Sequence, residues 1–313
     1  MAIKTIAIDS GKFATKAVTR KPDGTERKVS FRTKMEPTMR SEAQGNSFIV
    51  TYEGKKYMIG EQAEVLSSKT TKAEEIHRIC AYTAITQLAE SGDDLFIAIG
   101  CPLTMYENAD TRKAYKDYMF PTKEIHVNVN GVTRHYNVKS VAVFPESAGV
   151  IYLDKEKYGQ ATVGVIDIGG LNVNASVYRQ ETPIVSTIFT DNLGSNVLTN
   201  GLLNQLQTYY SEDIPDWMAE EILRDGYMVD NMAADGIREG SANLVEDYKK
   251  DHLRKIIRQC EENGWNMRAT KLIFTGGTSL LLAKEIRSMY PTAVISEDAA
   301  FANVRGFLKE LAG

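Results

Sequence analysis

The sequence has few of the residues that build covalent or metal-based frameworks. Its 313 residues include only three cysteines, Cys80, Cys101 and Cys260, and four histidines. The cysteines are widely spaced and odd in number, which fits buried thiols in a reducing compartment better than disulfide bridges. The histidines form no pattern of metal ligands. We therefore expect neither a disulfide scaffold nor a zinc site.

Long apolar runs and an excess of positive charge are also lacking. The longest apolar stretches have about eight residues or fewer, too short for a transmembrane helix. Asp9 interrupts the N-terminal stretch where a signal peptide would remain apolar. The net charge of −4 gives no basic footprint for direct binding of DNA or RNA. We expect a soluble cytoplasmic protein that contacts neither membrane nor nucleic acid directly.

What the sequence does contain is an alternation of strand-like and helix-like segments along its length. Residues 3–9 and 161–167 are apolar and β-branched, as in buried strands, whereas 74–89 and 241–263 have helical spacing. With 43% apolar residues the chain can fill a core. The mixed order is typical of layered α/β proteins.

Local signals predict three further features. Asn130-Gly131 between two alternating segments predicts a tight β-hairpin. Pro145 suits a first helical turn, so we expect a helix from there through about Asp154. Residues 184–189 are expected to form a strand.

The two halves of the sequence begin alike. Residues 8–17, Ile-Asp-Ser-Gly-Lys-Phe-Ala-Thr-Lys-Ala, align with residues 166–175, Ile-Asp-Ile-Gly-Gly-Leu-Asn-Val-Asn-Ala, so that aspartate matches aspartate and glycine matches glycine. Each copy is a strand, an Asp-x-Gly turn and a second strand. A repeat at about half the chain length predicts two similar α/β domains.

The repeated turn has the chemistry of a phosphate site. Asp9 and Asp167 end buried strands, where a carboxylate needs a cationic partner. The glycine two residues later lets backbone N–H groups approach a ligand. Two such hairpins would clamp a phosphate and hold a hydrated Mg²⁺. Either turn alone is also what an ordinary hairpin contains, and it is the pairing that favours the phosphate role.

Five motifs together resemble the actin, sugar-kinase and heat-shock-chaperone ATPase superfamily. Residues 6–16 resemble its first phosphate hairpin, and residues 165–174 its second. Residues 143–149 (Val-Phe-Pro-Glu-Ser-Ala-Gly) resemble its first connecting segment, and residues 302–306 (Ala-Asn-Val-Arg-Gly) its second. Residues 272–279 (Leu-Ile-Phe-Thr-Gly-Gly-Thr-Ser) resemble its adenosine segment. The resemblance implies an actin-like fold, with two similar ribonuclease-H-like α/β domains and a nucleotide cleft between them. We expect domain I to comprise 1–150 plus 299–313, and domain II 151–298.

The length and two of the motifs favour one branch of that superfamily. The chain leaves no room for the peptide-binding part of a chaperone or for most sugar kinases, and it shows no amphipathic membrane anchor. Pro-Glu-Ser at 145–147 and Ile-Asp-Ile-Gly-Gly at 166–170 are similar to ParM/StbA-type bacterial actins. This resemblance implies a homopolymer, a filament that assembles on binding ATP or GTP with Mg²⁺ and hydrolyses the nucleotide. It also implies plasmid segregation through a DNA-binding adaptor protein on a centromere-like site.

The resemblance assigns roles to the charged residues. Asp9 and Asp167 would hold Mg²⁺ through water, and Glu146 would position the attacking water, so these three are the expected catalytic carboxylates. The other interpretation of Glu146 is structural: a carboxylate in the first turn of a helix is stabilised by the helix dipole. Lys16 would reach a phosphate as a point charge, with Lys12 as the alternative. Lys16 also suits a surface position on an amphipathic strand, and the sequence leaves the two interpretations open.

The other expected nucleotide contacts are the turns and their neighbours. Glycine N–H groups would face the β- and γ-phosphates, the Gly-Gly turn before Thr278 would lie against adenine and ribose, and Gly194 precedes a helix whose N–H groups would face the nucleotide. The expected set is Ser10, Gly11, Gly169, Gly170, Leu171, Asn172, Gly194, Gly276, Gly277, Thr278 and Asn303. Leu171, Asn172 and Asn174 depart from the Thr or Asp of relatives, so the hydrolysis rate and the choice between ATP and GTP stay open.

Two other functions remain as alternatives. A small-molecule kinase of the same superfamily would need a catalytic Asp beside the γ-phosphate, and no residue can be assigned to that role. A nucleotide-dependent switch would form no filament. Phosphate transfer to a sugar tests the first alternative, and light scattering on addition of nucleotide tests the second.

Overall fold

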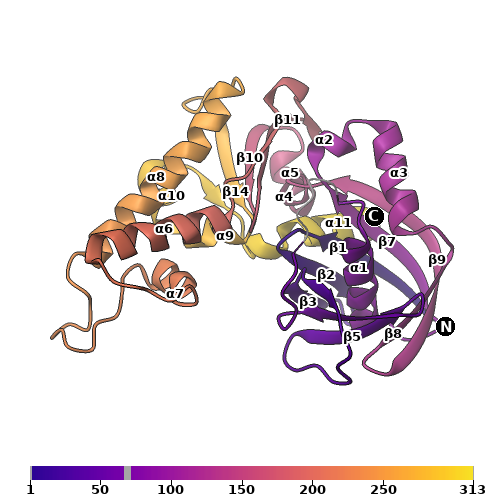
Figure 1. Ribbon diagram of the computed structural model, residues 1–313. Helices are drawn as coiled ribbons and strands as arrows, with labels where there is room; N and C mark the ends of the chain where they lie inside the picture. Colours follow the sequence, from indigo (N-terminus) through magenta and orange to yellow (C-terminus); the bar gives the residue numbers. More distant parts are fainter. Residues whose placement is uncertain (1, 67–71, 313) are drawn as a thin grey trace. The chain divides into compact units, whose positions relative to one another are not determined.

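The computed structural model describes residues 2–66 and 72–312 (Figure 1). Contacts among the Cα atoms divide the chain into two compact units. Unit 1 is Met1–Gly159 together with Phe301–Gly313, and unit 2 is Gln160–Ala300. The domain limits expected from the sequence, 1–150 plus 299–313 and 151–298, stay a prediction.

Unit 1 is built on a nine-stranded sheet. Its elements are β1 (Ile3–Ser10), β2 (Ala14–Arg20), β3 (Glu26–Arg32), β4 (Met35–Pro37), β5 (Ser47–Tyr52), β6 (Lys55–Gly60), α1 (Glu75–Leu88), β7 (Asp94–Cys101), α2 (Leu103–Tyr106), α3 (Ala109–Met119), β8 (Glu124–Val129), β9 (Val132–Pro145), α4 (Gly149–Leu153), α5 (Lys155–Tyr158) and α11 (Ala302–Ala312). The strand order is β3-β2-β1-β7-β9-β8-β5-β6-β4. The expected hairpin joins β8 to β9, where Asn130 and Gly131 both have positive φ, 51° and 82°.

The sheet of unit 1 is covered on both faces. Alternate residues of β1 point to opposite sides, so Ile6 and Ile8 pack in the same cluster as α1, whereas Ala7 packs with Phe307 and Leu308 of α11. Helix α11 thus returns the C-terminal end of the chain to the N-terminal sheet (Figure 1). This packing fixes β1, and with it the turn that follows β1.

Unit 2 contains a six-stranded sheet and the longest helix of the described residues. Its elements are β10 (Thr162–Ile168), β11 (Val173–Arg179), β12 (Thr182–Pro183), the 3₁₀ turn η1 (Val185–Thr187), β13 (Phe189–Asp191), α6 (Ser195–Tyr210), α7 (Met218–Asp225), α8 (Ser241–Glu262), β14 (Lys271–Thr275), α9 (Gly277–Leu281), α10 (Ala283–Met289), β15 (Val294–Ile295) and η2 (Ala299–Phe301), which crosses into unit 1. The strand order is β12-β11-β10-β14-β15, with β13 beside β11. Helices α6, α7, α8 and α10 share one buried core with β10, β11 and β14.

The two sheets follow the same path. In unit 1, β1 is antiparallel to β2 and parallel to β7, and β7 is parallel to β9. In unit 2, β10 is antiparallel to β11 and parallel to β14, and β14 is parallel to β15. The order β3-β2-β1-β7-β9 therefore repeats as β12-β11-β10-β14-β15. The predicted α/β fold with two similar halves is confirmed.

Two expectations about local structure are wrong. Pro145 does not open a helix: it is the last residue of β9, it lies opposite Cys101 of β7, and α4 begins only at Gly149. Residues 184–189 do not form one strand, because the Thr187 hydroxyl accepts from Val177 N–H at 3.0 Å and so takes the place of a backbone partner. At Pro145 pairing with a distant strand overrides the local helix signal, and at residues 184–189 a side-chain hydrogen bond interrupts the strand.

No helix among the described residues combines the length and apolarity needed to cross a bilayer.

Candidate functional site

The first hairpin turns between β1 and β2. Asp9 lies opposite Lys16 in the register of the two strands, so their side chains are on the same face of the sheet. A Cβ at Gly11 would lie 2.8 Å from the carbonyl oxygen of Ala14, so the turn accepts only glycine there without a shift. The Ser10 hydroxyl donates to the carbonyl of His77 at 3.0 Å, which directs this side chain into the interior.

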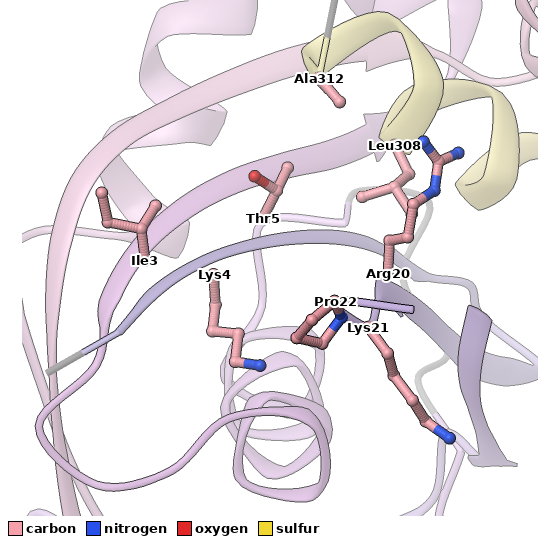
Figure 2. A pocket seen from close by; sticks show the side chains of 8 residues that line it. All are labelled: Ile3, Lys4, Thr5, Arg20, Lys21, Pro22, Leu308 and Ala312. Atoms are coloured by element: carbon pink, nitrogen blue, oxygen red, sulfur yellow. The ribbon is translucent and has the colours of Figure 1, made fainter. Parts of the chain in front are cut away.

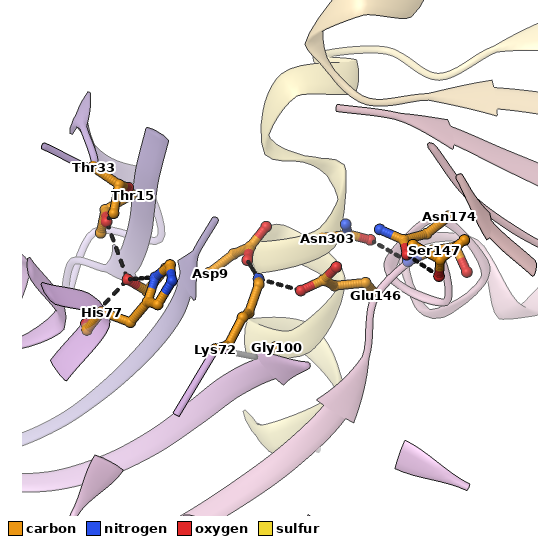
Figure 3. Close-up of polar contacts among 12 residues, drawn as sticks. Asp9, Thr15, Thr33, Lys72, His77, Gly100, Glu146, Ser147, Asn174 and Asn303 are labelled. Atoms are coloured by element: carbon orange, nitrogen blue, oxygen red, sulfur yellow. Dashed lines mark hydrogen bonds and ion pairs between the residues drawn. The ribbon is translucent and has the colours of Figure 1, made fainter. Parts of the chain in front are cut away.

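Asp9 is paired with a buried lysine that the sequence did not reveal. Lys72 Nζ lies 3.0 Å from Asp9 Oδ1 and also pairs with Glu146 Oε1 (Figure 3). The Lys72 side chain is only 4% exposed. Burial alone would lower the pKa of Lys72, but the charges of Asp9 and Glu146 outweigh it and raise the pKa well above its ordinary range. Lys72 therefore stays protonated and is the counter-ion that both carboxylates share.

Lys12 adds a second cation near the same group. Burial lowers the pKa of Lys12, and the charge of Lys72 lowers it further, while Glu146 acts in the opposite direction. Lys12 is thus within electrostatic reach of the Lys72–Glu146 pair, and Lys16 shares the face of Asp9. Both lysines considered as phosphate ligands lie in the first hairpin, and the choice between them stays open.

Glu146 is buried where β9 ends. Its N–H donates to the carbonyl of Cys101 at 2.8 Å, so the main chain continues the β7–β9 pairing rather than starting a helix. Ser147 follows with a φ of 73°, a left-handed conformation that is strained for serine. The N–H of Ser147 donates to Asn303 Oδ1 at 3.1 Å. The strained turn that holds Glu146 is therefore tied to α11.

Two glycines bring the predicted connecting segments together. A Cβ at Gly306 would lie 2.0 Å from the carbonyl oxygen of Gly149, and a Cβ at Gly149 would lie 2.3 Å from the Cα of Asn303. Helices α4 and α11 therefore cross at backbone contact distance. The close crossing positions both Ser147 and Asn303.

The second hairpin turns between β10 and β11. Asp167, which is 7% exposed, lies opposite Asn174, and Asn174 Oδ1 accepts from the Thr190 hydroxyl at 2.8 Å. The N–H of Gly169 donates to the carbonyl of Asn172 at 2.8 Å and closes the turn. Asp167 thus occupies the position in β10 that Asp9 occupies in β1.

The start of α6 holds the tip of the second hairpin. The N–H groups of Gly194, Ser195 and Asn196 donate to the carbonyls of Leu171, Gly169 and Gly170, at 3.2, 3.1 and 2.9 Å. We expected these N–H groups to face the nucleotide, and the structure instead engages them in bonds to the hairpin. A direct contact between Gly194 and nucleotide stays a prediction.

The Gly276-Gly277-Thr278 segment packs against the same hairpin. The Thr278 hydroxyl donates to the carbonyl of Gly169 at 2.7 Å. Gly276 has a φ of +82°, and a Cβ there would lie 2.3 Å from the oxygen of Ile168 and 2.4 Å from Asp167 Oδ1. The structure therefore brings Asp167, the hairpin tip, Gly194 and the expected adenosine segment together within unit 2.

Each hairpin, taken by itself, carries groups of the kind expected at a phosphate site. Both hairpins have tight glycine turns, cations flank the first, and Asp9 and Asp167, with carboxylate oxygens of the kind that Mg²⁺ prefers, are the next-to-last residues of β1 and β10. Within residues 2–66 and 72–312, no three His, Cys, Asp or Glu side chains converge to hold a metal directly. Binding of Mg²⁺ through water by Asp9 and Asp167 stays a prediction.

Comparison with known proteins shows which proteins the chain is similar to. Residues 7–149 match the family described as the N-terminal domain of actin-like proteins. No curated protein sequence matches the chain significantly. Among solved structures, the Alp12 filament structure is 28% identical, with a TM-score of 0.76 over 100% of this chain and 99% of that chain.

Two further structures are similar in fold. The archaeal actin homolog Ta0583 in complex with ADP is 18% identical, with a TM-score of 0.77 and coverage of 99% of both chains. The 15-stranded ParM filament from Clostridium botulinum is 18% identical, with a TM-score of 0.75 over 100% of this chain and 99% of that chain. The actin-like fold implied by the five motifs is confirmed: residues 7–149 match the actin-like family model, and the whole chain is similar in fold to the Alp12 and ParM filament proteins.

Proposed function

We propose that this protein is an actin-like nucleoside triphosphatase that assembles into filaments on binding Mg-ATP or Mg-GTP and then hydrolyses the nucleotide. The observation that carries the proposal is the duplicated hairpin. Asp9 and Asp167 are the next-to-last residues of equivalent strands in two sheets with one strand path, and a glycine turn follows each strand. Similarity to the Alp12 filament and to an ADP complex of an actin homolog supports it.

The proposed chemistry is mostly placement and charge neutralisation. Backbone N–H groups of the hairpin tips, with Lys12 or Lys16, would receive the phosphates. Mg²⁺, held through water by Asp9 and Asp167, would neutralise phosphate charge. Glu146 would orient the attacking water, and no covalent intermediate is required.

Lys72 and Ser147 would keep Glu146 ready for that role. The ion pair with Lys72 favours the ionised carboxylate, which can accept a hydrogen bond from water. The bond from Ser147 N–H to Asn303 Oδ1 fixes the main chain beside Glu146. Lys72 and Asn303 are therefore proposed as positioning residues.

The biological role that we propose is segregation of plasmid DNA in the cytoplasm. The ParM-type resemblance supports this role, and the net charge of −4 favours a DNA-binding adaptor protein over a direct grip on DNA. The filament would be a homopolymer that captures the adaptor.

Right-angle light scattering with simultaneous phosphate release tests the proposal. Mg-ATP, with Mg-GTP as the comparison, should raise scattering above a critical concentration, and phosphate release should follow. Glu146→Gln should still bind nucleotide and polymerise, but hydrolyse at least tenfold more slowly, whereas the exposed Glu156→Gln should match the wild type. Phosphate release without scattering would replace the filament by a soluble switch or a kinase. Wild-type hydrolysis by Glu146→Gln would remove Glu146 from the mechanism.

A further inference from the structure

A small basic pocket lies at the end of the sheet of unit 1 away from the phosphate hairpin. It has a volume of about 300 Å³ and is lined by the start of β1, the end of β2 and the end of α11 (Figure 2). Lys4, Arg20 and Lys21 supply three cations, and the apolar wall includes Ile3, Pro22 and Leu308. Because β1 rises roughly 3.3 Å per residue, this pocket is separated from Asp9 by roughly 17 Å.

Nearby acids balance only part of the charge of this pocket: Asp23 interacts electrostatically with Lys21, and Glu26 lies opposite Arg20 in the register of β2 and β3. Nearby, Lys28 and Arg305 both pair with Glu26, at 3.7 and 2.8 Å. In the described part of the chain, no such ion pair involves Lys4, Arg20 or Lys21. Residues 2–34 contain nine lysines and arginines against three acids, although the whole chain is acidic. The pocket therefore favours an anionic ligand that also carries an apolar group.

Unit 2 carries a segment of the opposite character. Residues 209–240 contain nine acids against two arginines. Within this segment Trp217 precedes α7 and is 69% exposed, because the buried face of α7 consists of Ala219, Ile222 and Leu223. Tryptophan is enriched among the residues that dominate the energy of protein interfaces. Its exposure has no explanation in the packing of unit 2.

Carboxylates flank the tryptophan on both sides. Asp213 and Asp216 precede it, Glu220 and Glu221 lie in the first turn of α7, and all four are exposed. Residues three and four positions apart on a helix are neighbours, so the two glutamates lie beside the indole. The Trp217 segment thus offers one exposed aromatic side chain with four exposed carboxylates close to it in the sequence.

We propose that the Trp217 segment of one copy of this chain docks into the Lys4–Arg20–Lys21 pocket of a second copy. Charge complementarity identifies the partner, because the pocket has three cations and the Trp217 segment has four carboxylates. Size agrees, because a pocket of about 300 Å³ is at the lower end of small-ligand pockets and suits one aromatic ring. The two surfaces are different and every copy carries both, so the contact is heterologous and can extend into a filament. The inference rests on the proposed filament function and names the surfaces that would form it.

The test uses the full chain with Mg-ATP. The critical concentration of Trp217→Ala and of the Arg20→Glu, Lys21→Glu double variant should rise at least tenfold over that of the wild type. The matched control, Lys55→Glu with Lys123→Glu, makes the same charge change at exposed sites outside the pocket and should stay within twofold of the wild type. All variants should bind a fluorescent ATP analogue as the wild type does, because neither surface includes a residue of the proposed nucleotide site.

Two further measurements distinguish docking from misfolding. Trp217 emission in the wild type should shift to the blue on assembly, since the other tryptophan, Trp265, is already buried. The pocket variant keeps the Trp217 segment, and Trp217→Ala keeps the pocket. Mixing the two should therefore give a 1:1 complex in sedimentation velocity and no filaments, because neither end of that complex can bind a further copy.

The outcomes separate the two proposals. If the wild type fails to polymerise, the filament function fails and this inference fails with it. If the wild type polymerises and both variants keep its critical concentration, or Trp217 emission does not move, the docking contact alone is wrong.

Discussion

The two Asp-x-Gly hairpins follow the same backbone path but are held in different ways. The first depends on buried charge, because Asp9 and Glu146 share the ammonium of Lys72. The second depends on backbone contacts, because the start of α6 and Thr278 bond to its carbonyls and Gly276 packs against Asp167. A duplicated fold thus repeats the strand path and not the side chains that support it. The first hairpin should therefore respond to pH and charge substitution, and the second to steric change.

The largest effect is expected at Gly276 in the second hairpin. Gly276→Ala forces a side chain onto a φ of +82° and into two oxygens less than 2.5 Å away, so unfolding of the protein should become about 5 kcal/mol easier. The control is Gly226→Ala, where the backbone is in the αL region and no atom lies within 4 Å of the Cβ, so that only a strain of about 1 kcal/mol remains. At Gly276 a ψ of 155° adds the strain of a conformation that is essentially restricted to glycine. Urea denaturation measures both. Equal losses for the two variants would mean that the contact with Asp167 is irrelevant.

Lys72 provides the corresponding test in the first hairpin. Lys72→Met leaves the buried carboxylate of Glu146 and the partly buried carboxylate of Asp9 without their shared counter-ion, and should lower the free energy of unfolding by about 4 kcal/mol at pH 8. Lys72→Arg keeps the charge and should retain most of the stability. Urea denaturation of both variants measures the effect, and an equal loss of stability in Lys72→Arg would show that packing rather than charge is what Lys72 contributes.

The first hairpin should also have a pH signature through His77. Burial, then the charge of Lys72, lowers the pKa of this imidazole from 6.5 to about 4, with Glu74 and Asp9 acting in the opposite direction. Because the folded-state pKa is the lower one, the unfolded chain binds more protons between pH 6.5 and 4, and stability falls as the pH falls through that window. Each unit of pKa shift corresponds to about 1.4 kcal/mol, so the free energy of unfolding should fall by about 3 kcal/mol at most.

His77→Gln is the control for this prediction. It removes the titrating group, so the slope of unfolding free energy against pH should flatten between pH 6.5 and 4. Thermal unfolding over that range measures the slope in both proteins. An unchanged slope in the variant would assign the pH dependence to other groups.

The smallest effect is expected from a single hydrogen bond to the second hairpin. Thr278→Val removes the donor to the Gly169 carbonyl and should cost about 1 kcal/mol, because Ser195 N–H still donates to that oxygen. Thr208→Val removes an exposed hydroxyl bonded within α6 and should change stability by less than about 0.5 kcal/mol. Urea denaturation compares them. A loss of stability in Thr278→Val as large as that in Gly276→Ala would contradict the view that several hydrogen bonds to backbone carbonyls together hold the second hairpin.

Much of the fold could be predicted because its signals are local. The hairpin at Asn130-Gly131 and the strands that end in Asp9 and Asp167 follow from turn residues and apolar runs a few residues long. The half-length repeat predicted two similar sheets, and both sheets have one strand path. Asp9 and Asp167 occupy equivalent positions because the repeat encodes both the strand and the turn after it.

Lys72 shows what the sequence could not provide. It comes 63 positions after Asp9 and 74 before Glu146, in a polar stretch without helical or strand periodicity. Only its burial beside two strand ends makes it the counter-ion of both carboxylates. A buried Asp at a strand end predicted that some cation must pair with it, but not which one.

By itself, the sequence determined the duplicated α/β fold, the two Asp-x-Gly turns and the candidate carboxylates, because these depend on residues close together in the chain. Tertiary structure alone decided that Pro145 ends a strand, that Lys72 joins Asp9 to Glu146, and that the N–H groups of residues 194–196 hold a hairpin tip. Each of these depends on a contact between segments that are separated in the sequence. Such contacts form when sheets and helices pack, and no local pattern of residue types specifies them.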